Sequence, residues 1–84
     1  MHKIEFKKSV KKELENVPDT DFIKVDSAIH SLKKNPYPFP QSKKLEDEDK
    51  FRLRVGDYRI IYTVDNHDKV ITIHRVRHRK DVYR

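Results

Sequence analysis

The chain has 84 residues, of which 40% are charged and 35% hydrophobic, and its formal net charge is +6. This length supports one small domain with a thin core, so we treat residues 1–84 as a single domain. The absence of cysteine excludes disulfides, thiolate zinc sites and cysteine nucleophiles, and a single glycine, Gly56, excludes a glycine-rich phosphate loop. No apolar run approaches the length of a signal sequence or a membrane span, so we expect a cytoplasmic protein.

The first third of the chain predicts a strand followed by two helices. Residues 2–6 alternate polar and apolar side chains, as a strand does. Residues 8–16 carry apolar side chains at helical spacing, and Pro18 ends this helix because its ring disfavours a helical conformation in the preceding residue. We expect a second amphipathic helix to begin with Asp19 or Thr20 as its cap.

A proline-rich connector follows these helices. Residues 35–42 hold three of the four prolines of the chain, and this composition favours an extended segment. We interpret it as a crossover loop between the helices and the remaining strands.

The period of the pattern then changes from 3.6 to 2. Three strands are predicted, over residues 50–55, 58–64 and 69–77, with turns at Gly56-Asp57 and at residues 65–68. The predicted fold is α+β in the order β-α-α-β-β-β, with the N-terminal strand and the helix hairpin packed on an antiparallel sheet. One face of the sheet is then covered by the helices and the other is open.

The positive charge lies in the second half of the chain. Residues 1–49 carry ten lysines and ten acidic residues, whereas residues 50–84 carry ten lysines and arginines against four aspartates. Every arginine occurs at or after Arg52. Arginine concentrated in one region indicates bidentate contacts with phosphates or carboxylates, although a solvated basic surface has the same composition.

Strand alternation gathers part of this charge on one face. Lys50, Arg52 and Arg54 share a face, and Arg59 should lie close to Arg54 across the Gly56 turn. Like charges on an open sheet face repel each other, which favours an anion as their ligand.

The C-terminal residues supply a second basic cluster, which includes a histidine and a tyrosine. Guanidinium groups bind phosphate and an aromatic ring can stack on a base, so the cluster is typical of a site for single-stranded RNA. Cleavage of RNA by its own 2′-hydroxyl requires a base, an acid and positive charge at the phosphate, but no metal. The cluster comprises Arg75, Arg77, His78, Arg79, Lys80, Tyr83 and Arg84.

A metal site is not favoured, and no cofactor is expected. The acidic run at residues 46–49 splays its neighbouring carboxylates, and no histidine is spaced to join them. The remaining histidines are interpreted as surface or sheet residues, namely His2, His30, His67 and His74.

Two blocks of sequence resemble a known family. Residues 51–62, which contain Arg-Val-Gly-Asp-Tyr-Arg-Ile-Ile-Tyr, and residues 76–84, which contain His-Arg-Lys-Asp-Val-Tyr-Arg, look like the RelE/ParE superfamily of bacterial and archaeal type II toxins. The resemblance implies the RelE-like microbial ribonuclease-type fold. It also implies a ribosome-dependent endoribonuclease (an mRNA interferase) that cuts messenger RNA in the ribosomal A site and inhibits translation. The implied partner is a cognate antitoxin, with which the toxin forms a hetero-oligomer.

The same resemblance assigns the catalytic residues. Arg59 matches the arginine expected to hold the scissile phosphate, and Arg79 matches a second catalytic arginine. Tyr83 matches the C-terminal tyrosine that stacks on the base or transfers a proton. His78 stands where some relatives have a lysine and is a candidate acid.

The resemblance also assigns RNA-binding residues. Lys50 and Arg52 match basic residues that line the site, and Arg54 is the next residue of that face. Arg77 is a further RNA-binding candidate, although it stands where many relatives have a glycine. No carboxylate stands where some members have their general base, so Tyr83 or Lys50 is the candidate base.

Two other functions stay open at this point. ParE-like relatives share the fold but poison gyrase without nuclease activity, and they tend to lack the arginine–tyrosine set that is present here. A basic binding module without chemistry is the third interpretation.

Overall fold

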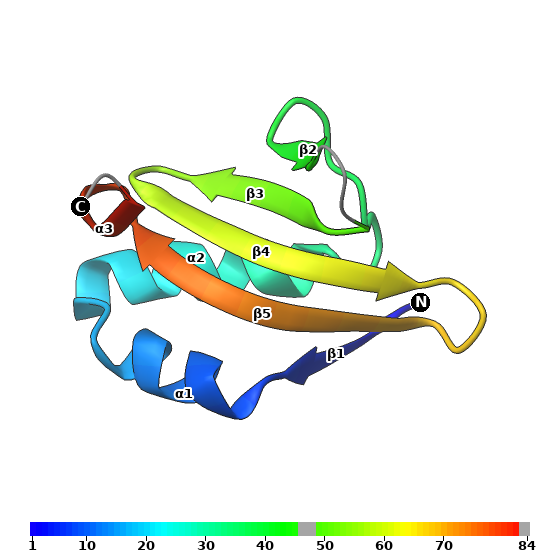
Figure 1. The fold of residues 1–84 in the computed structure, drawn as a ribbon, viewed down its shortest axis with the longest axis horizontal. Coiled ribbons are helices and arrows are strands. Elements are labelled where there is room, and N and C mark those ends of the chain that lie inside the picture. The colour runs from blue at the N-terminus through cyan, green and yellow to red at the C-terminus, as the bar shows by residue number, and fades with distance from the viewer. Residues whose placement is uncertain (46–48, 83–84) are drawn as a thin grey trace.

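The computed structural model describes residues 1–45 and 49–82, and only the backbone for Asp81 and Val82. Three helices are present in this part of the chain: α1 Lys8–Glu15, α2 Asp19–Ser31 and α3 Arg79–Val82. Five strands form one sheet: β1 Lys3–Phe6, β2 Ser42–Lys44, β3 Phe51–Val55, β4 Tyr58–Asp65 and β5 Val70–His78. The sheet has the order β1-β5-β4-β3-β2 (Figure 1).

The α+β architecture is confirmed, with two corrections to the predicted sheet. Strand β1 pairs with β5 in parallel, so the sheet is mixed rather than antiparallel throughout. β2 begins at the last residue of the predicted connector, Ser42, and continues to Lys44; it pairs antiparallel with β3 and makes a fifth strand. Alternation predicts that a segment is a strand but not the direction of its neighbour, and β2 is too short and polar to show alternation.

The predicted side-chain cap of the second helix is wrong. Pro18 occupies the N-cap position of α2, where no side chain forms a capping hydrogen bond. The Pro18 carbonyl accepts the N–H groups of Asp21 and Phe22 at 2.9 and 2.8 Å. Asp19 lies in the first turn instead, where its negative charge interacts favourably with the helix dipole.

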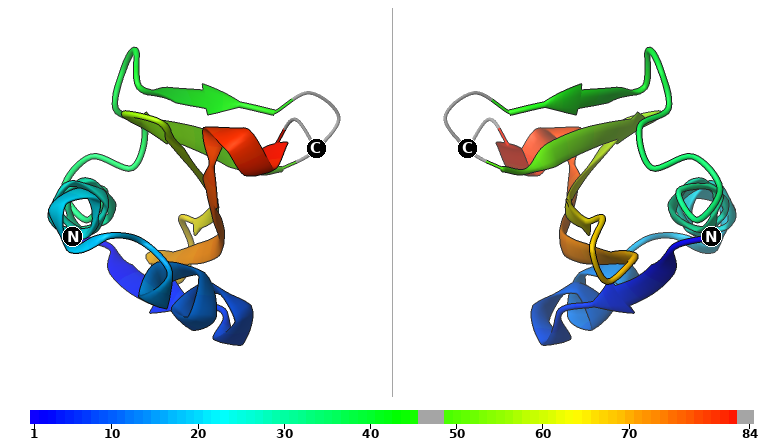
Figure 2. Two further views of the ribbon diagram at one scale, coloured as in Figure 1. Left: turned by 90° about the vertical axis from the view of Figure 1, so that its left-hand side faces the viewer. Right: turned by 90° about the vertical axis from the view of Figure 1, so that its right-hand side faces the viewer.

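The core lies between the helices and one face of the sheet. Figure 2 shows α2 and the short α3 on opposite sides of the sheet. Phe22 on α2 is 38% exposed. The buried apolar residues come from α1, α2, the segments that follow them, and β3, β4 and β5: Val10, Val17, Val25, Ile29, Leu32, Leu53, Tyr58, Ile60, Tyr62, Ile71, Ile73 and Val76.

A register shift divides β5 into two parts. Ile61 pairs with Arg75 and the next residue, Tyr62, pairs with Ile73, so His74 is an extra residue in β5. An extra residue reverses the alternation of side chains along a strand. In β5, odd-numbered residues therefore face the helices before His74, and even-numbered residues face them after it.

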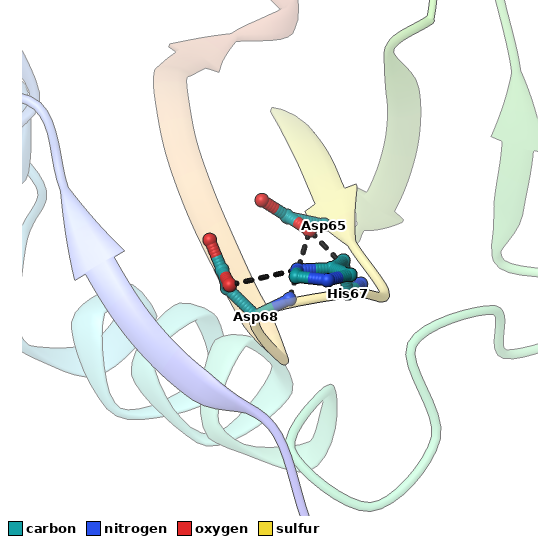
Figure 3. A network of polar contacts seen from close by, with 3 residues as sticks. All are labelled: Asp65, His67 and Asp68. Atoms are coloured by element: carbon teal, nitrogen blue, oxygen red, sulfur yellow. Dashed lines mark hydrogen bonds and ion pairs between the residues drawn. The ribbon is translucent and has the colours of Figure 1, made fainter.

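The two turns of the meander lie at opposite ends of β4. At the β4–β5 turn, one carboxylate oxygen of Asp65 accepts the N–H groups of His67 and Asp68, each at 3.0 Å (Figure 3). Nδ1 of His67 also lies 3.0 Å from Oδ1 of Asp68. The predicted turn is confirmed, and these contacts give His67 a local role in it.

The proline-rich segment is held against the sheet by Tyr62. The buried Tyr62 hydroxyl donates a hydrogen bond to the Pro36 carbonyl at 2.6 Å and also bonds to the Ser42 hydroxyl. The Phe51 ring lies between the rings of Tyr37 and Tyr62, with centroid distances of 5.0 and 5.6 Å. These contacts fix the entry into β2.

Candidate functional site

Basic side chains from four strands, β2 to β5, share the open face of the sheet. Lys43 on β2 pairs with Arg52 on β3. On the neighbouring row, Arg54 pairs with Arg59, and Arg59 pairs with Arg77 on β5. Residues that pair across strands point to the same side, so the predicted proximity of Arg54 and Arg59 is confirmed. Like charges placed directly opposite each other destabilise a sheet, and such an arrangement is typical of a surface that binds an anion.

Three arginines converge on one pocket at the end of this face. The pocket has a volume of about 280 Å³. Arg54 and Arg79 are exposed and Arg59 is half-buried. The residues that line this pocket, which we call the arginine pocket, are Arg54, Gly56, Asp57, Tyr58, Arg59 and Arg79.

The β3–β4 turn brings Arg79 to the other two arginines. The Arg79 N–H donates to the Asp57 carbonyl at 2.6 Å, which joins the start of α3 to the turn. Gly56 has a φ of +56°, which a glycine adopts without the penalty that a Cβ would bring. A Cβ at this position would meet nothing within 4 Å, so the backbone angle rather than a close contact favours glycine.

The Tyr58 ring separates the arginine pocket from His78. Tyr58 is 8% exposed, and its hydroxyl donates to Asp21 at 3.5 Å. His78 pairs with Tyr58 in the sheet register, and the two rings meet edge-on with centroids 5.0 Å apart. His78 therefore lies on the side of the sheet that faces the helices. It lines a different pocket, of about 540 Å³, so the structure does not bring it together with Arg59 and Arg79.

Arg77 lies on the open face and forms an ion pair with a carboxylate of the same chain. Its Nε lies 3.3 Å from Oε2 of Glu13 on α1, and Arg75 lies 4.0 Å from the same oxygen. The other oxygen of Glu13 accepts the N–H of Val76 at 3.0 Å. The Glu13 carboxylate thus joins α1 to the part of β5 that follows Ile73, where β5 no longer pairs with β1. Glu13 could not be identified from the sequence, because its place on a helix gives no sign of a strand partner.

Lys50 does not line the arginine pocket. Lys50 immediately precedes β3, and its carbonyl accepts the Leu45 N–H at 2.9 Å. Burial lowers the pKa of His74, and the charges of Lys7 and Lys50 lower it further. Tyr83 lies outside the described residues, so its role stays a prediction.

The described residues hold no group of three or more side chains that could bind a metal ion. Most of the acidic run considered above, residues 46–48, lies outside them. No helix in residues 1–45 and 49–82 is long and apolar enough to span a bilayer.

The arginine pocket is suited to bind a phosphodiester. Guanidinium groups donate paired hydrogen bonds to phosphate oxygens and keep their charge at any physiological pH. Fixed donors of this kind also stabilise the extra negative charge that develops on a phosphate under attack.

Comparisons with known proteins are consistent with this geometry. Residues 4–83 match the family model described as the ParE toxin of the type II toxin-antitoxin system parDE. The chain is also 32% identical over 84 residues to the protein named toxin RelE1 of Methanocaldococcus jannaschii, and the match covers 96% of this chain and 93% of that protein.

Two solved structures have the same fold. A chain of the archaeal RelE-RelB complex from Pyrococcus horikoshii OT3 superimposes with a TM-score of 0.84 at 32% identity, covering 93% of this chain and 94% of that one. A chain of the toxin-antitoxin complex RelBE2 from Mycobacterium tuberculosis superimposes with a TM-score of 0.81 at 26% identity, covering 93% and 98%.

Proposed function

The chain belongs to the RelE/ParE superfamily of type II toxins, and we propose that it is an endoribonuclease that cleaves messenger RNA in the ribosomal A site. The observation that carries the proposal is the convergence of Arg54, Arg59 and Arg79 on one pocket. Two of these arginines are the ones that the sequence blocks assign to catalysis, although they are far apart along the chain.

In the proposed reaction the 2′-hydroxyl of one nucleotide attacks the adjacent phosphorus. The bond to the 5′ oxygen breaks, which yields a 2′,3′-cyclic phosphate and a free 5′-hydroxyl. Arg59 and Arg79 hold the phosphate and stabilise its charge in the transition state, and Arg54 supports them. One group takes the 2′-hydroxyl proton and another donates a proton to the 5′ oxygen.

The proton carriers are assigned by the family resemblance. Tyr83 and Lys50 are the candidate bases, and His78 is the candidate acid. His78 lines a pocket on the other side of Tyr58, which argues against direct contact with a phosphate held by Arg59 and Arg79. Cleavage rates measured against pH for H78Q and Y83F distinguish these roles, because loss of the acid removes the descending limb of the profile.

We also propose a cognate antitoxin as the partner. Two solved relatives are chains of toxin–antitoxin complexes. An acidic antitoxin segment would neutralise the open face, where Lys43, Arg52 and Arg54 have no acidic neighbour in the cross-strand register of the described strands. Affinity between the two proteins is then expected to fall with rising salt concentration.

The first experiment is primer extension on a defined messenger, with purified toxin, in the presence and absence of translating ribosomes. Wild-type toxin should cut within codons only when ribosomes are present. R59A should lower the cleavage rate about 100-fold or more, the typical loss when one donor to a transition-state oxyanion is removed. R75A is the matched control, because Arg75 lies on the same face but does not line the arginine pocket.

Other outcomes identify other functions. Growth arrest without cuts in either lane would refute the ribonuclease and favour a gyrase poison, the ParE-like alternative. RNA binding without cuts or growth arrest would indicate a basic binding module. Equal loss of cleavage in R59A and R75A would refute the assignment of the arginine pocket as the catalytic site.

A further inference from the structure

A second pocket adjoins the arginine pocket on the open face. It has a volume of about 500 Å³, within the usual range for small-molecule sites. Arg54 and Gly56 line both pockets, so the two are adjacent. The residues that line this second pocket, which we call the β2 pocket, are Pro40, Gln41, Lys43, Arg52, Arg54 and Gly56.

We propose that the β2 pocket binds a second nucleotide of the RNA strand whose scissile phosphate lies in the arginine pocket. This inference rests on the proposed function, because it takes RNA as the substrate. It adds Lys43 and the Phe39–Gln41 segment to the binding surface.

The charge of the β2 pocket supports a phosphate as its ligand. Three of its six lining residues are cationic, and none carries a carboxylate. Lys43 and Arg52 are direct cross-strand partners, an arrangement in which like charges repel in the absence of an anion. A phosphate between them would remove this repulsion, whereas a neutral ligand would not.

The backbone holds the wall of the pocket in place. The Arg54 N–H donates to the Gln41 carbonyl at 2.9 Å, which extends the pairing of β2 and β3 beyond Ser42. The Ser42 N–H donates to the Pro38 carbonyl at 2.7 Å and closes the turn that carries Phe39 and Pro40. These two backbone hydrogen bonds fix the β2 side of the pocket.

The rim of the pocket offers a surface for a base. Pro40 supplies an apolar wall, and the preceding residue, Phe39, is 90% exposed. An aromatic ring that stacks on a base is a common device for holding single-stranded nucleic acid, and it tolerates any sequence. Phosphate contacts at Lys43 and stacking at Phe39 together fit a nucleotide.

Lys44 provides a matched control for Lys43. Both are exposed lysines on β2, but Lys44 pairs with Phe51 and so lies on the opposite side of the sheet. K43Q and K44Q remove the same charge from the same strand, and only K43Q removes it from the β2 pocket.

The test measures binding of labelled 2′-O-methyl oligonucleotides by fluorescence anisotropy. The methyl group blocks attack by the 2′ oxygen, so binding is measured without cleavage. A dinucleotide has one phosphodiester and fills the arginine pocket alone, whereas a tetranucleotide reaches the β2 pocket as well. The wild-type protein, K43Q, K44Q and F39A are compared at several salt concentrations, with thermal unfolding as the check on folding.

The wild-type protein should bind the tetranucleotide more tightly than the dinucleotide. K43Q should reduce this difference and lower the slope of log affinity against log salt by about 0.7, the value for one phosphate contact to a single strand. F39A should weaken tetranucleotide binding about tenfold, within the range for one stacked base. K44Q should match the wild type in both respects.

Three results would overturn the proposal. The first is a tetranucleotide that binds no better than the dinucleotide. The second is an equal effect of K43Q and K44Q on the tetranucleotide. The third is an effect of K43Q on ribosome binding alone, which would make ribosomal RNA the ligand of the pocket. Failure of the proposed function is distinct, because wild-type toxin would then not cut messenger RNA on ribosomes at all.

Discussion

Replacing Glu13 by alanine is expected to destabilise the protein and to loosen the part of the sheet that carries Arg77. The Glu13 carboxylate accepts the Val76 N–H at 3.0 Å and pairs with Arg77 at 3.3 Å. Val76 is 4% exposed, so its N–H has poor access to water once this acceptor is lost. The change therefore removes a hydrogen bond at the edge of β5, where β1 no longer covers the strand.

The two contributions of Glu13 have different sizes. An unsatisfied, poorly hydrated N–H costs about 1–3 kcal/mol. The ion pair with Arg77 contributes at most about 1 kcal/mol, because the arginine side chain is 41% exposed. For a domain of this size, about 1 kcal/mol lowers the melting temperature by roughly 4–8 °C. The two contributions together amount to about 1–4 kcal/mol, so E13A should lower the melting temperature by roughly 4–30 °C. E13Q keeps a neutral acceptor and should lower the melting temperature much less.

Thermal unfolding followed by circular dichroism checks this prediction, in an R59A background that permits expression if the toxin is active. E15A is the control, because Glu15 lies on the same helix with an exposed side chain. Hydrogen exchange should show faster exchange of the Val76 amide in E13A. A melting temperature of E13A equal to that of E15A would refute the reasoning.

Three further predictions concern the turns and two titrating groups. G56A should lower the free energy of unfolding, measured in urea, by about 1–2 kcal/mol, because Gly56 has a φ of +56°. K69G should leave this free energy unchanged or raise it, because Lys69 has a φ of 58°. A K69G variant less stable than G56A would refute a backbone cause. Burial raises the pKa of Tyr62, so its contribution to stability is present below the normal pKa near 10.0 and declines above it. Y62F should be less stable than the wild type at neutral pH, but its free energy of unfolding should fall less at high pH. Equal pH profiles of stability for the two proteins would contradict this. Burial lowers the pKa of His74, so its contribution is present above about pH 6.5 and declines below; H74Q should therefore lose less stability between pH 7 and pH 5 than the wild type, as measured by urea unfolding at both values.

Local pattern was sufficient to predict most of the elements and the proximity of two of the three arginines in the arginine pocket. Alternation in β3 and a two-residue turn at Gly56 place Arg54 beside Arg59, and the register confirms this. The position of Arg79 could not be predicted in this way, because it depends on the hydrogen bond from its N–H to the Asp57 carbonyl. The family resemblance, rather than local pattern, is what linked Arg79 to Arg59.

The features missed from the sequence depend on contacts between distant segments. β2 is a strand because Ser42, Lys43 and Lys44 pair with β3, and three polar residues show no apolar alternation by themselves. Lys43 was therefore not included among the candidate residues. Glu13 was missed for the same reason, since its partners on β5 are more than 60 residues away.

The extra residue in β5 decides which side chains can act together. Before His74, the odd-numbered Ile71 and Ile73 are buried, and after it the even-numbered Val76 is buried. If β5 instead paired regularly through His74, Tyr58 would pair with Arg77, which would then point toward the helices, and His78 would fall on the open face. The observed register does the reverse, since it pairs Arg59 with Arg77 and Tyr58 with His78.

The same shift is visible in the sequence, because the apolar residues of β5 change from odd-numbered to even-numbered positions. The pattern Ile-Thr-Ile-His-Arg-Val over residues 71–76 has two polar residues together, where a regular strand has one. Because β1 also ends at Phe6, opposite Ile73, the shift coincides with the point where α1 and Glu13 replace β1 as the neighbour of β5. The extra residue thus lies where the edge of β5 changes from pairing with β1 to contact with α1. That inserted residue also turns the arginines of β5 toward the open face, where the proposed RNA strand binds.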